Sequence, residues 1–193
     1  DGTIVAIGAK WGNDASGNAA GHVRVFEYNG SDWIQIGSDI DGEAAGDNSG
    51  FSVSISSDGS IVSIGAPNND GNGEDAGHVR VFEYSGSDWV QLGSDIDGEA
   101  EGDGIASIVN GNISLSSDGT IVAFGARQND GNGSSTGHVR VFEYSGGDWI
   151  QLGSDIDGEA DGDVLGDAVS LNSNGTILAV GAVGGNDVNG IMT

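Results

Sequence analysis

One octapeptide recurs three times and sets what this chain can fold into. The string GHVRVFEY begins at Gly21, Gly77 and Gly137, so successive copies are 56 and 60 residues apart. The 27 residues that start at Gly77 match those that start at Gly137 at 24 positions. A period of this length indicates one supersecondary unit stacked several times, each copy burying its apolar surface against the next.

Each unit is predicted to contain two hairpins. Residues 52–56 and 60–66 form β-rich runs joined by a tight turn, in which Gly59 supplies the positive φ. Residues 78–84 and 89–96 are rich in β-branched and aromatic side chains and flank a second turn of Ser, Gly and Asp. The sequence therefore predicts four antiparallel strands per unit. It predicts no helix, because no apolar stripe with a 3.6-residue period persists.

Four strands in 56–60 residues are the dimensions of a β-propeller blade, so we predict an all-β chain of such blades. Apolar residues on both faces of the strands favour small sheets sandwiched between their neighbours. The expected units are residues 1–57, 58–117 and 118–173, with the start of a fourth at 174–193, all in one propeller-type domain. We expect an open segment of a propeller of about seven blades, or of an assembly, because three blades do not close a ring.

The chain is strongly acidic. Thirty acidic against five basic residues give a net charge of −25, which disfavours nucleic acids and anionic membrane surfaces as partners. No apolar run approaches the ~18 residues of a membrane span, so no membrane insertion is expected. Cysteine is absent, which excludes disulfides and thiolate metal sites. Cations are the natural counterpart of such a surface.

Two short motifs mark the second unit. Gly50-Phe51 follows shortly after Asp47, and residues 64–67 read Ile-Gly-Ala-Pro. Together they resemble the FG-GAP repeat of integrin α-chains and related extracellular propellers. The third and fourth units depart from the pattern: their FG positions read Asn-Gly-Asn-Ile at 110–113, after an insertion, and Leu-Gly-Asp-Ala at 165–168.

The resemblance implies an extracellular or cell-surface adhesion-type propeller, often loaded with calcium. In that family the calcium loop is a long Asp-rich run in the hairpin between the first two strands of a blade. The corresponding hairpin here is the short Ser-Ser-Asp-Gly at 56–59. The metal site of the family therefore does not carry over to this chain.

An acidic cluster recurs where each unit runs into the next. The pattern Asp-x-Asp-Gly-Glu with a later Asp supplies several hard oxygen donors, which suits Ca²⁺ as the expected cofactor. The alternative is a solvated turn in which Asp side chains cap backbone N–H groups. The candidate metal ligands are Asp39, Asp41, Glu43, Asp47, Asp95, Asp97, Glu99, Asp103, Asp155, Asp157, Glu159 and Asp163.

Three other features repeat. An Asn-Asp-Gly loop at 68–73 and 128–133 is a second, weaker candidate for metal binding and has ordinary turn composition. The recurring histidines are not expected to converge on one metal, because equivalent positions on successive blades are rotated around the ring. We expect the arginines to form ion pairs and the tryptophans to pack between blades. These residues are His22, His78 and His138; Arg24, Arg80 and Arg140; and Trp33, Trp89 and Trp149.

Two kinds of carbohydrate site are also predicted. Trp11 lies outside the repeat pattern, in a loop, and is the candidate aromatic for stacking on a glycan. Asn-x-Ser/Thr sequences make four asparagines possible glycosylation sites on turns, although the same composition is common in turns generally. They are Asn29, Asn112, Asn132 and Asn174.

No residue set suggests catalysis. Every potential acid, base or nucleophile occurs in several copies, and no nucleophile-elbow or phosphate-binding motif is present, so we predict that the chain is not an enzyme. Three functions remain open: an extracellular adhesion module, a structural repeat that assembles into a sheath or filament, and a lectin-like propeller. The expected partner is a protein or glycan ligand, or further copies of the chain.

Overall fold

The computed structural model describes residues 2–14, 17–107 and 112–184, and these contain strands and turns without any helix. Within these ranges, no helix is long and apolar enough to span a membrane. The strands are β1 (Ile4–Ala9), β2 (His22–Tyr28), β3 (Trp33–Gln35), β4 (Ile40–Asp41), β5 (Ser52–Ile55), β6 (Ile61–Ala66), β7 (His78–Tyr84), β8 (Trp89–Gln91), β9 (Ile96–Asp97), β10 (Ile113–Leu115), β11 (Ile121–Ala126), β12 (His138–Ser145), β13 (Asp148–Gln151), β14 (Ile156–Asp157), β15 (Leu165–Leu171) and β16 (Leu178–Ala182).

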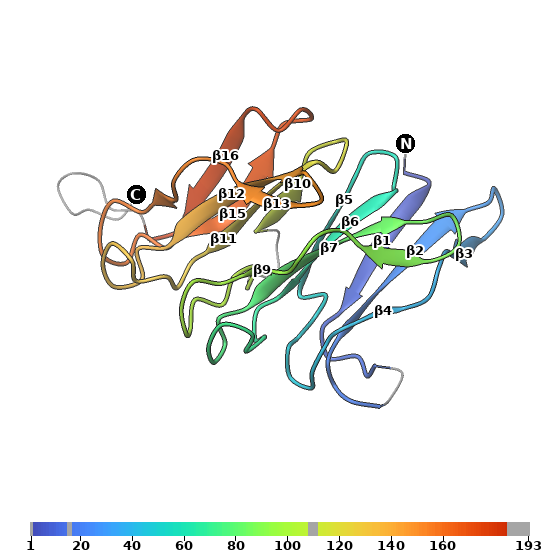
Figure 1. The fold of residues 1–193 in the computed structure, drawn as a ribbon, viewed down its shortest axis with the longest axis horizontal. Helices are drawn as coiled ribbons and strands as arrows, with labels where there is room; N and C mark the ends of the chain where they lie inside the picture. Colours follow the sequence, from blue (N-terminus) through green and yellow to red (C-terminus); the bar gives the residue numbers. More distant parts are fainter. Residues whose placement is uncertain (1, 15–16, 108–111, 185–193) are drawn as a thin grey trace.

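The strands form separate antiparallel sheets that follow one another in chain order (Figure 1). The second sheet has the order β5-β6-β7-β8, and β9 also pairs with β7. The third sheet repeats this arrangement with β10 to β14, the first contains β1 to β4, and β15-β16 is a further hairpin. The prediction of all-β, propeller-type blades is confirmed.

One strand differs from its prediction. The outer strand expected at residues 89–96 is divided into β8 and β9, which pair with β7 at separate places. Between them, Gly93 has a φ of 75°, which bends the chain, and the Ser94 N–H donates to Asp148 of the next unit at 2.9 Å. Contact with the neighbouring sheet therefore replaces part of the edge pairing.

The predicted tight hairpins are present. In the turn between β5 and β6, Gly59 has a φ of 76°. The Asp58 carboxylate accepts hydrogen bonds from the N–H and hydroxyl of Ser60, at 3.0 and 2.7 Å, and from the Ser56 hydroxyl at 2.8 Å. These bonds, led by the Ser60 N–H, lower the pKa of Asp58 below its usual value. The same turn recurs around Asp118.

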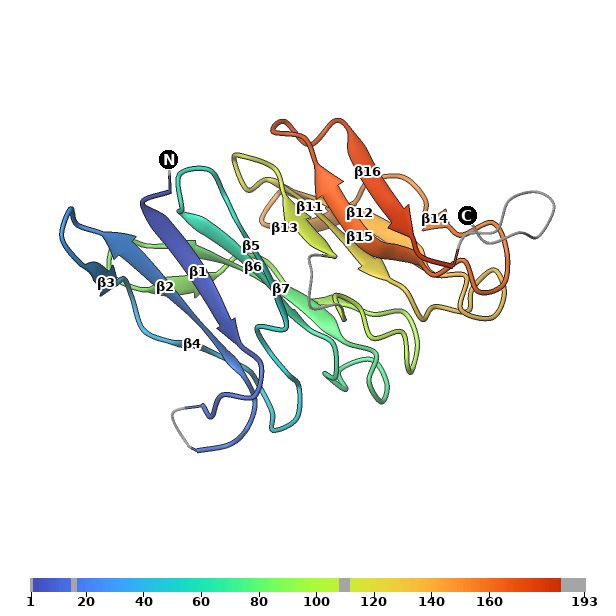
Figure 2. The same ribbon diagram turned by 180° about the vertical axis from the view of Figure 1, so that it is seen from behind.

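The hydrophobic core lies between successive sheets. One cluster joins the first sheet to the second and includes Val23, Val25, Val62, Ile64 and Phe82. A second cluster joins the second sheet to the third and includes Val79, Val81, Val122, Phe124 and Trp149. Seen from behind, β1 and β5 lie side by side where the first two sheets meet (Figure 2). Apolar residues on both faces of a strand are thus explained by a neighbour on each side.

The glycines of the FG and GAP positions meet across two of the three junctions of the described residues. A Cβ on Gly8 would overlap the backbone of Gly50, and one on Gly125 would overlap the backbone of Gly166. Gly50 and Gly166 also have φ values of 82° and 92°, which favour glycine. The motif therefore serves a close backbone approach between one unit and the next.

In the third unit, Ala106 takes the place that Gly50 has in the second unit, ahead of residues 110–113 where the sequence predicted the FG position. Ala106 lies against Gly65 of the preceding unit, and its N–H donates to Gly125 at 3.0 Å, as that of Gly50 does to Gly65 at 3.1 Å. Ala106 has a φ of 57°. The insertion follows this position, and Asn110 and Gly111 lie outside the described residues.

Two of the repeated tryptophans, Trp89 and Trp149, each form a hydrogen bond with the preceding unit. The Trp89 indole N–H donates to the Ile36 carbonyl at 2.9 Å, and that of Trp149 donates to the Leu92 carbonyl at 2.7 Å. Beside Trp89, the carboxylate of Asp88 accepts the Ser38 N–H at 2.8 Å. The predicted packing of tryptophan between blades is confirmed for Trp89 and Trp149.

The first and last sheets leave one face uncovered. Ile7 of β1 is 50% exposed, whereas Ile64, at the equivalent position of the second unit, is 1% exposed. In the fourth unit, Ile177 is 66% exposed. Its equivalent in the third unit, Ile121, is partly buried and lies against Gly175 of the fourth unit. Both outer faces therefore have the apolar character of faces that are buried inside the stack.

Candidate functional site

The twelve predicted acidic ligands do not form one metal-binding cluster per loop, because the acids of each loop have different partners. Asp47, Asp103 and Asp163 are buried and cap the turn that precedes them. In each, one carboxylate oxygen accepts hydrogen bonds from backbone N–H groups three or four residues earlier, at 2.8–3.2 Å. For these three residues, the turn-capping alternative describes the structure.

The first acids of the loops bind within their own unit. The side-chain amides of Gln35, Gln91 and Gln151 donate to Asp39, Asp95 and Asp155, respectively, at 2.6–2.7 Å. These bonds hold each carboxylate at the start of its loop and leave its second oxygen for other contacts.

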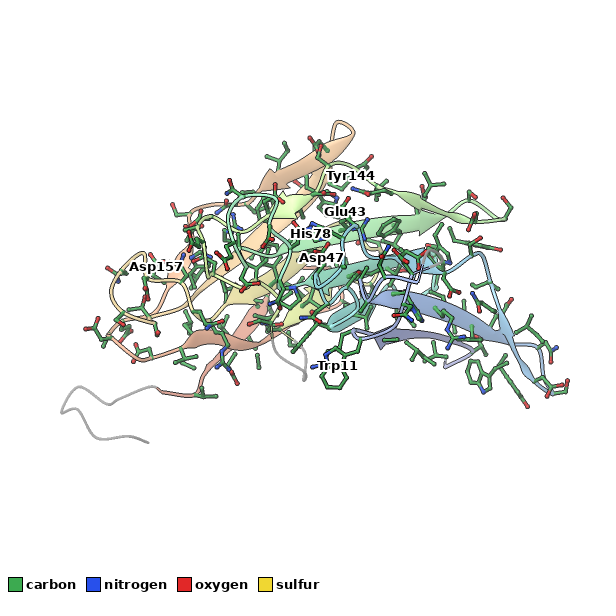
Figure 3. All side chains as sticks on the ribbon, turned by 90° about the horizontal axis from the view of Figure 1, so that it is seen from below. Trp11, Glu43, Asp47, His78, Tyr144 and Asp157 are labelled. Atoms are coloured by element: carbon green, nitrogen blue, oxygen red, sulfur yellow. The ribbon has the colours of Figure 1, made fainter. Side chains whose placement is uncertain are left out.

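Of the second acids, Asp41, Asp97 and Asp157, the first two bind an arginine of the next unit through their backbone carbonyls. The guanidinium of Arg80 donates to the Asp41 carbonyl at 2.7 Å, and that of Arg140 donates to the Asp97 carbonyl at 2.6 Å. Partial burial and the nearby Asp95 raise the pKa of Asp97. Asp157, in β14, is exposed and lies far from Glu43 (Figure 3).

Glu43 and Glu99 reach across the junction to the next unit. Glu43 lies 3.6 Å from Nη1 of Arg80, and Glu99 lies 3.7 Å from Nη1 of Arg140. The expected ion pairs of the repeated arginines are thus present for Arg80 and Arg140, formed between units. Glu159, the third glutamate of the set, is exposed.

A buried histidine completes this arrangement. His78 is 1% exposed, and its Nδ1 lies 3.8 Å from a carboxylate oxygen of both Glu43 and Asp95. Glu43, Asp47 and His78 lie together in Figure 3, where the loops of two units meet. Burial, with a further contribution from the charge of Arg80, lowers the pKa of His78 to about 4 and outweighs the opposing effect of Asp95.

The same arrangement occurs at the second junction. His138 is buried, and its Nδ1 lies 3.9 Å from Glu99. Within the described ranges, two groups of three side chains place their potential ligand atoms within 4.8 Å of one another: Glu43, His78 and Asp95, and Glu99, His138 and Asp155. Each group combines a glutamate of one unit with a histidine and an aspartate of the next.

An acidic groove lies beside each group. The acidic turn of one unit faces the Asn-Asp-Gly loop of the following unit, and Asn69 bridges them by donating to Asp47 at 3.0 Å. The groove at the first junction has a volume of about 400 Å³ and that at the second about 680 Å³. The acidic residues that line the first groove are Glu43, Asp47, Asp70, Glu74 and Asp75. Those that line the second groove are Glu99, Glu101, Asp103 and Asp130.

The sequence correctly indicated that the histidines do not converge, because His78 and His138 lie in separate groups. It missed that His78 and His138 each meet carboxylates of two units. The signal was the constant spacing of Glu, His and Asp in every copy, which becomes informative only when adjacent units are assumed to be in contact. In the first unit, the ring of His22 instead forms a hydrogen bond with the Asn13 carbonyl at 3.2 Å.

The predicted carbohydrate sites lie apart from the junctions. Trp11 is 78% exposed and projects from the loop after β1 (Figure 3). Asn29, Asn132 and Asn174 are exposed, whereas Asn112 is fully buried and donates to the Gly125 carbonyl at 3.3 Å. Asn112 therefore does not suit a glycan, because its amide nitrogen faces the interior. Glycan stacking on Trp11 stays a prediction.

Comparison with known proteins supports the fold. The family model of the FG-GAP repeat matches residues 39–82. No curated protein sequence matches the chain. Among solved structures, a candidate 6-phosphogluconolactonase from Bacteroides uniformis has a TM-score of 0.55 at 14% identity and is aligned over 94% of this chain. This chain spans 51% of that protein, about half of its length.

Two other solved structures align with lower TM-scores. TolB from Acinetobacter baumannii has a TM-score of 0.49 at 12% identity, covering 97% of this chain and 40% of TolB. A periplasmic gluconolactonase from Pseudomonas aeruginosa has a TM-score of 0.44 at 15% identity, covering 93% of this chain and 42% of that one. At these identities, the likeness to solved structures concerns the fold alone. Residues 39–82 form an FG-GAP repeat, and the chain is an array of β-propeller-type blades.

Proposed function

We propose that the chain is a binding module of an extracellular or cell-surface adhesion protein and has no enzymatic activity. The observation that carries this proposal is the repetition of one groove at successive junctions, each lined by the same acidic turn and Asn-Asp-Gly loop. Equivalent surfaces in a fixed order suit the recognition of an extended or multivalent ligand. A reaction centre would instead require one unique constellation of side chains.

Calcium is proposed to occupy the acidic grooves and to stiffen the junctions. Glu74 and Asp70 line the first groove from the loop of one unit, and Asp47 lines it from the other unit. Carboxylate and carbonyl oxygens around an open, flexible loop are the donors that Ca²⁺ prefers. The large negative charge of the chain would further concentrate cations at these grooves.

Thermal unfolding in millimolar Ca²⁺ and in chelator tests this proposal. A ligand that binds only the native state must raise the unfolding midpoint, so we expect Ca²⁺ to stabilise the protein. The gain should shrink in a Glu74→Gln, Glu101→Gln double variant, which removes one charge from each groove. Glu83→Gln, on an exposed residue of β7 outside the grooves, is the control. An equal midpoint with Ca²⁺ and with chelator refutes the role of calcium.

The outer sheet faces favour a second candidate, assembly through the ends of the stack. Ile7 is 50% exposed where its equivalent Ile64 is covered. We propose that a further unit covers this face, either from a longer polypeptide or from another copy, as in a sheath or filament. Sedimentation over a range of concentrations tests self-assembly: association should be weakened by Ile7→Lys and unaffected by Ile150→Lys, on an exposed strand outside the junctions. A chain that stays monomeric at high concentration refutes self-assembly.

A further inference from the structure

We infer that each of the first two junctions between successive blades holds a divalent transition-metal ion of the zinc type, bound by one histidine and two carboxylates. The ligands are Glu43, His78 and Asp95 at the first junction, and Glu99, His138 and Asp155 at the second. This inference goes beyond the proposed calcium grooves and does not depend on them.

The first support is the state of the buried histidine. His78 is 1% exposed, and neither of its ring nitrogens has a hydrogen-bond partner among the described residues. A buried polar group without a partner is costly, so such a group is uncommon unless something else satisfies it. Its Nδ1 faces Glu43 and Asp95 at 3.8 Å, too far for a hydrogen bond but suited to ligands on either side of an ion.

The second support is the geometry of the three ligand atoms. Zinc binds His nitrogen and carboxylate oxygen at about 2.0–2.2 Å, which places neighbouring ligand atoms roughly 3.0–3.5 Å apart. The two histidine–carboxylate separations of 3.8 Å need to close by less than an ångström, and all three ligand atoms lie within 4.8 Å of one another. Glu43 can supply this movement, because its side chain is 45% exposed.

Charge and ligand type favour this class of ion. Arg80 lies 3.6 Å from Oε1 of Glu43, whereas Oε2 is the oxygen that faces His78. The two carboxylates exceed the charge of Arg80 by one unit, so a divalent cation is electrostatically acceptable. Imidazole is a common ligand of zinc and similar metals, whereas Ca²⁺ prefers sites built entirely of oxygen.

The site is repeated, which argues against a chance arrangement. His138 is also buried, and its Nδ1 lies 3.9 Å from Glu99. His22 occupies the same position of the first unit but forms a hydrogen bond with the Asn13 carbonyl. The structure therefore provides two sites and one internal control.

Calorimetric titration with Zn²⁺ in the presence of excess Ca²⁺ tests the inference, because Ca²⁺ occupies acidic surface sites that lack nitrogen ligands. After dialysis against chelator, the protein should bind two zinc ions. His78→Gln should bind one, the double variant with His138→Gln none, and His22→Gln still two. Circular dichroism checks that each variant is folded.

A second variant protects the test against loss of folding. Glu43→Gln combined with Glu99→Gln changes half-exposed side chains and should also abolish binding of both ions. The inference is overturned if the unaltered protein binds no zinc with Ca²⁺ present, or if either folded double variant retains both ions. Because stabilisation by Ca²⁺ is measured separately, failure here leaves the calcium proposal intact.

Discussion

Replacing Trp149 with Phe should weaken the junction between the second and third blades specifically. Trp149 is 7% exposed, packs against the hydrophobic core between these blades and donates its indole N–H to the Leu92 carbonyl at 2.7 Å. Trp33 occupies the same position in the first unit but is 48% exposed on the outer face. The same substitution at Trp33 is therefore a matched control.

The expected cost follows from two losses. Removing the indole N–H leaves the Leu92 carbonyl without this donor, which costs about 1–3 kcal/mol at a buried site. The smaller ring also leaves some tens of Å² of apolar contact unfilled, or about 1 kcal/mol. Together we expect Trp149→Phe to reduce the free energy of unfolding by about 2–4 kcal/mol. Trp33→Phe should change it by less than about 0.5 kcal/mol, as is usual for exposed positions.

Urea denaturation followed by circular dichroism measures both variants. With a slope of about 2–3 kcal/mol per molar urea, Trp149→Phe should lower the midpoint by about 1 M, whereas Trp33→Phe should leave it nearly unchanged. If the two substitutions cost the same, the tryptophans stabilise their own sheets and not the junctions. That result would refute the reasoning.

Two further predictions concern turns. Gly37→Ala should destabilise the protein in urea clearly more than Gly153→Ala. Both glycines have φ above 70°, but only at Gly37 would a Cβ meet the Trp89 ring, at 2.6 Å. Equal losses of stability would contradict this. Hydrogen bonds from its turn neighbours, led by the Ser116 hydroxyl, hold the pKa of Asp118 below its usual value of 3.8. The carboxylate therefore stabilises the fold above pH 3.8, and this contribution is lost as the pH falls through the lower, folded-state pKa. Asp118→Asn should make unfolding less sensitive to pH below 4, and an unchanged acid profile would contradict this.

Much of the fold could be predicted because the same unit recurs along the sequence and its period has the length of one blade. The hairpin turn at Gly59 and the strands on either side of it follow from local chemistry, and the repetition of apolar residues on both faces indicates stacking. The division of the outer strand at Gly93 could not be predicted, because it depends on Asp148 in the next unit. The role of Ala106 at the FG position could not be predicted for a related reason. The motif has glycine there, whereas the structure defines the position by its contact with Gly65 of the preceding unit.

The candidate site was predicted in composition but not in arrangement. Sequence proximity grouped Asp39, Asp41, Glu43 and Asp47 into one loop, yet their side chains have separate roles. Asp47 caps its own turn, and Glu43 belongs with His78 of the next unit. Spacing along the chain identifies oxygen donors, but the partner of each is set by the stacking of the sheets. The part played by His78 and His138 depends on the contact between units and could not be predicted from one unit alone.

The tryptophan and glutamate contacts give the array a direction. At the first and second junctions, one unit provides Glu43 or Glu99 and the backbone carbonyl that accepts the indole N–H, and the following unit provides the histidine, arginine and tryptophan. The two surfaces that meet are therefore different, so the interface is heterologous and cannot be satisfied by a twofold pair of identical faces. If further units join at either end, they must join head to tail, which leads to a closed ring if the rotation between units returns on itself and to an open fibre if it does not.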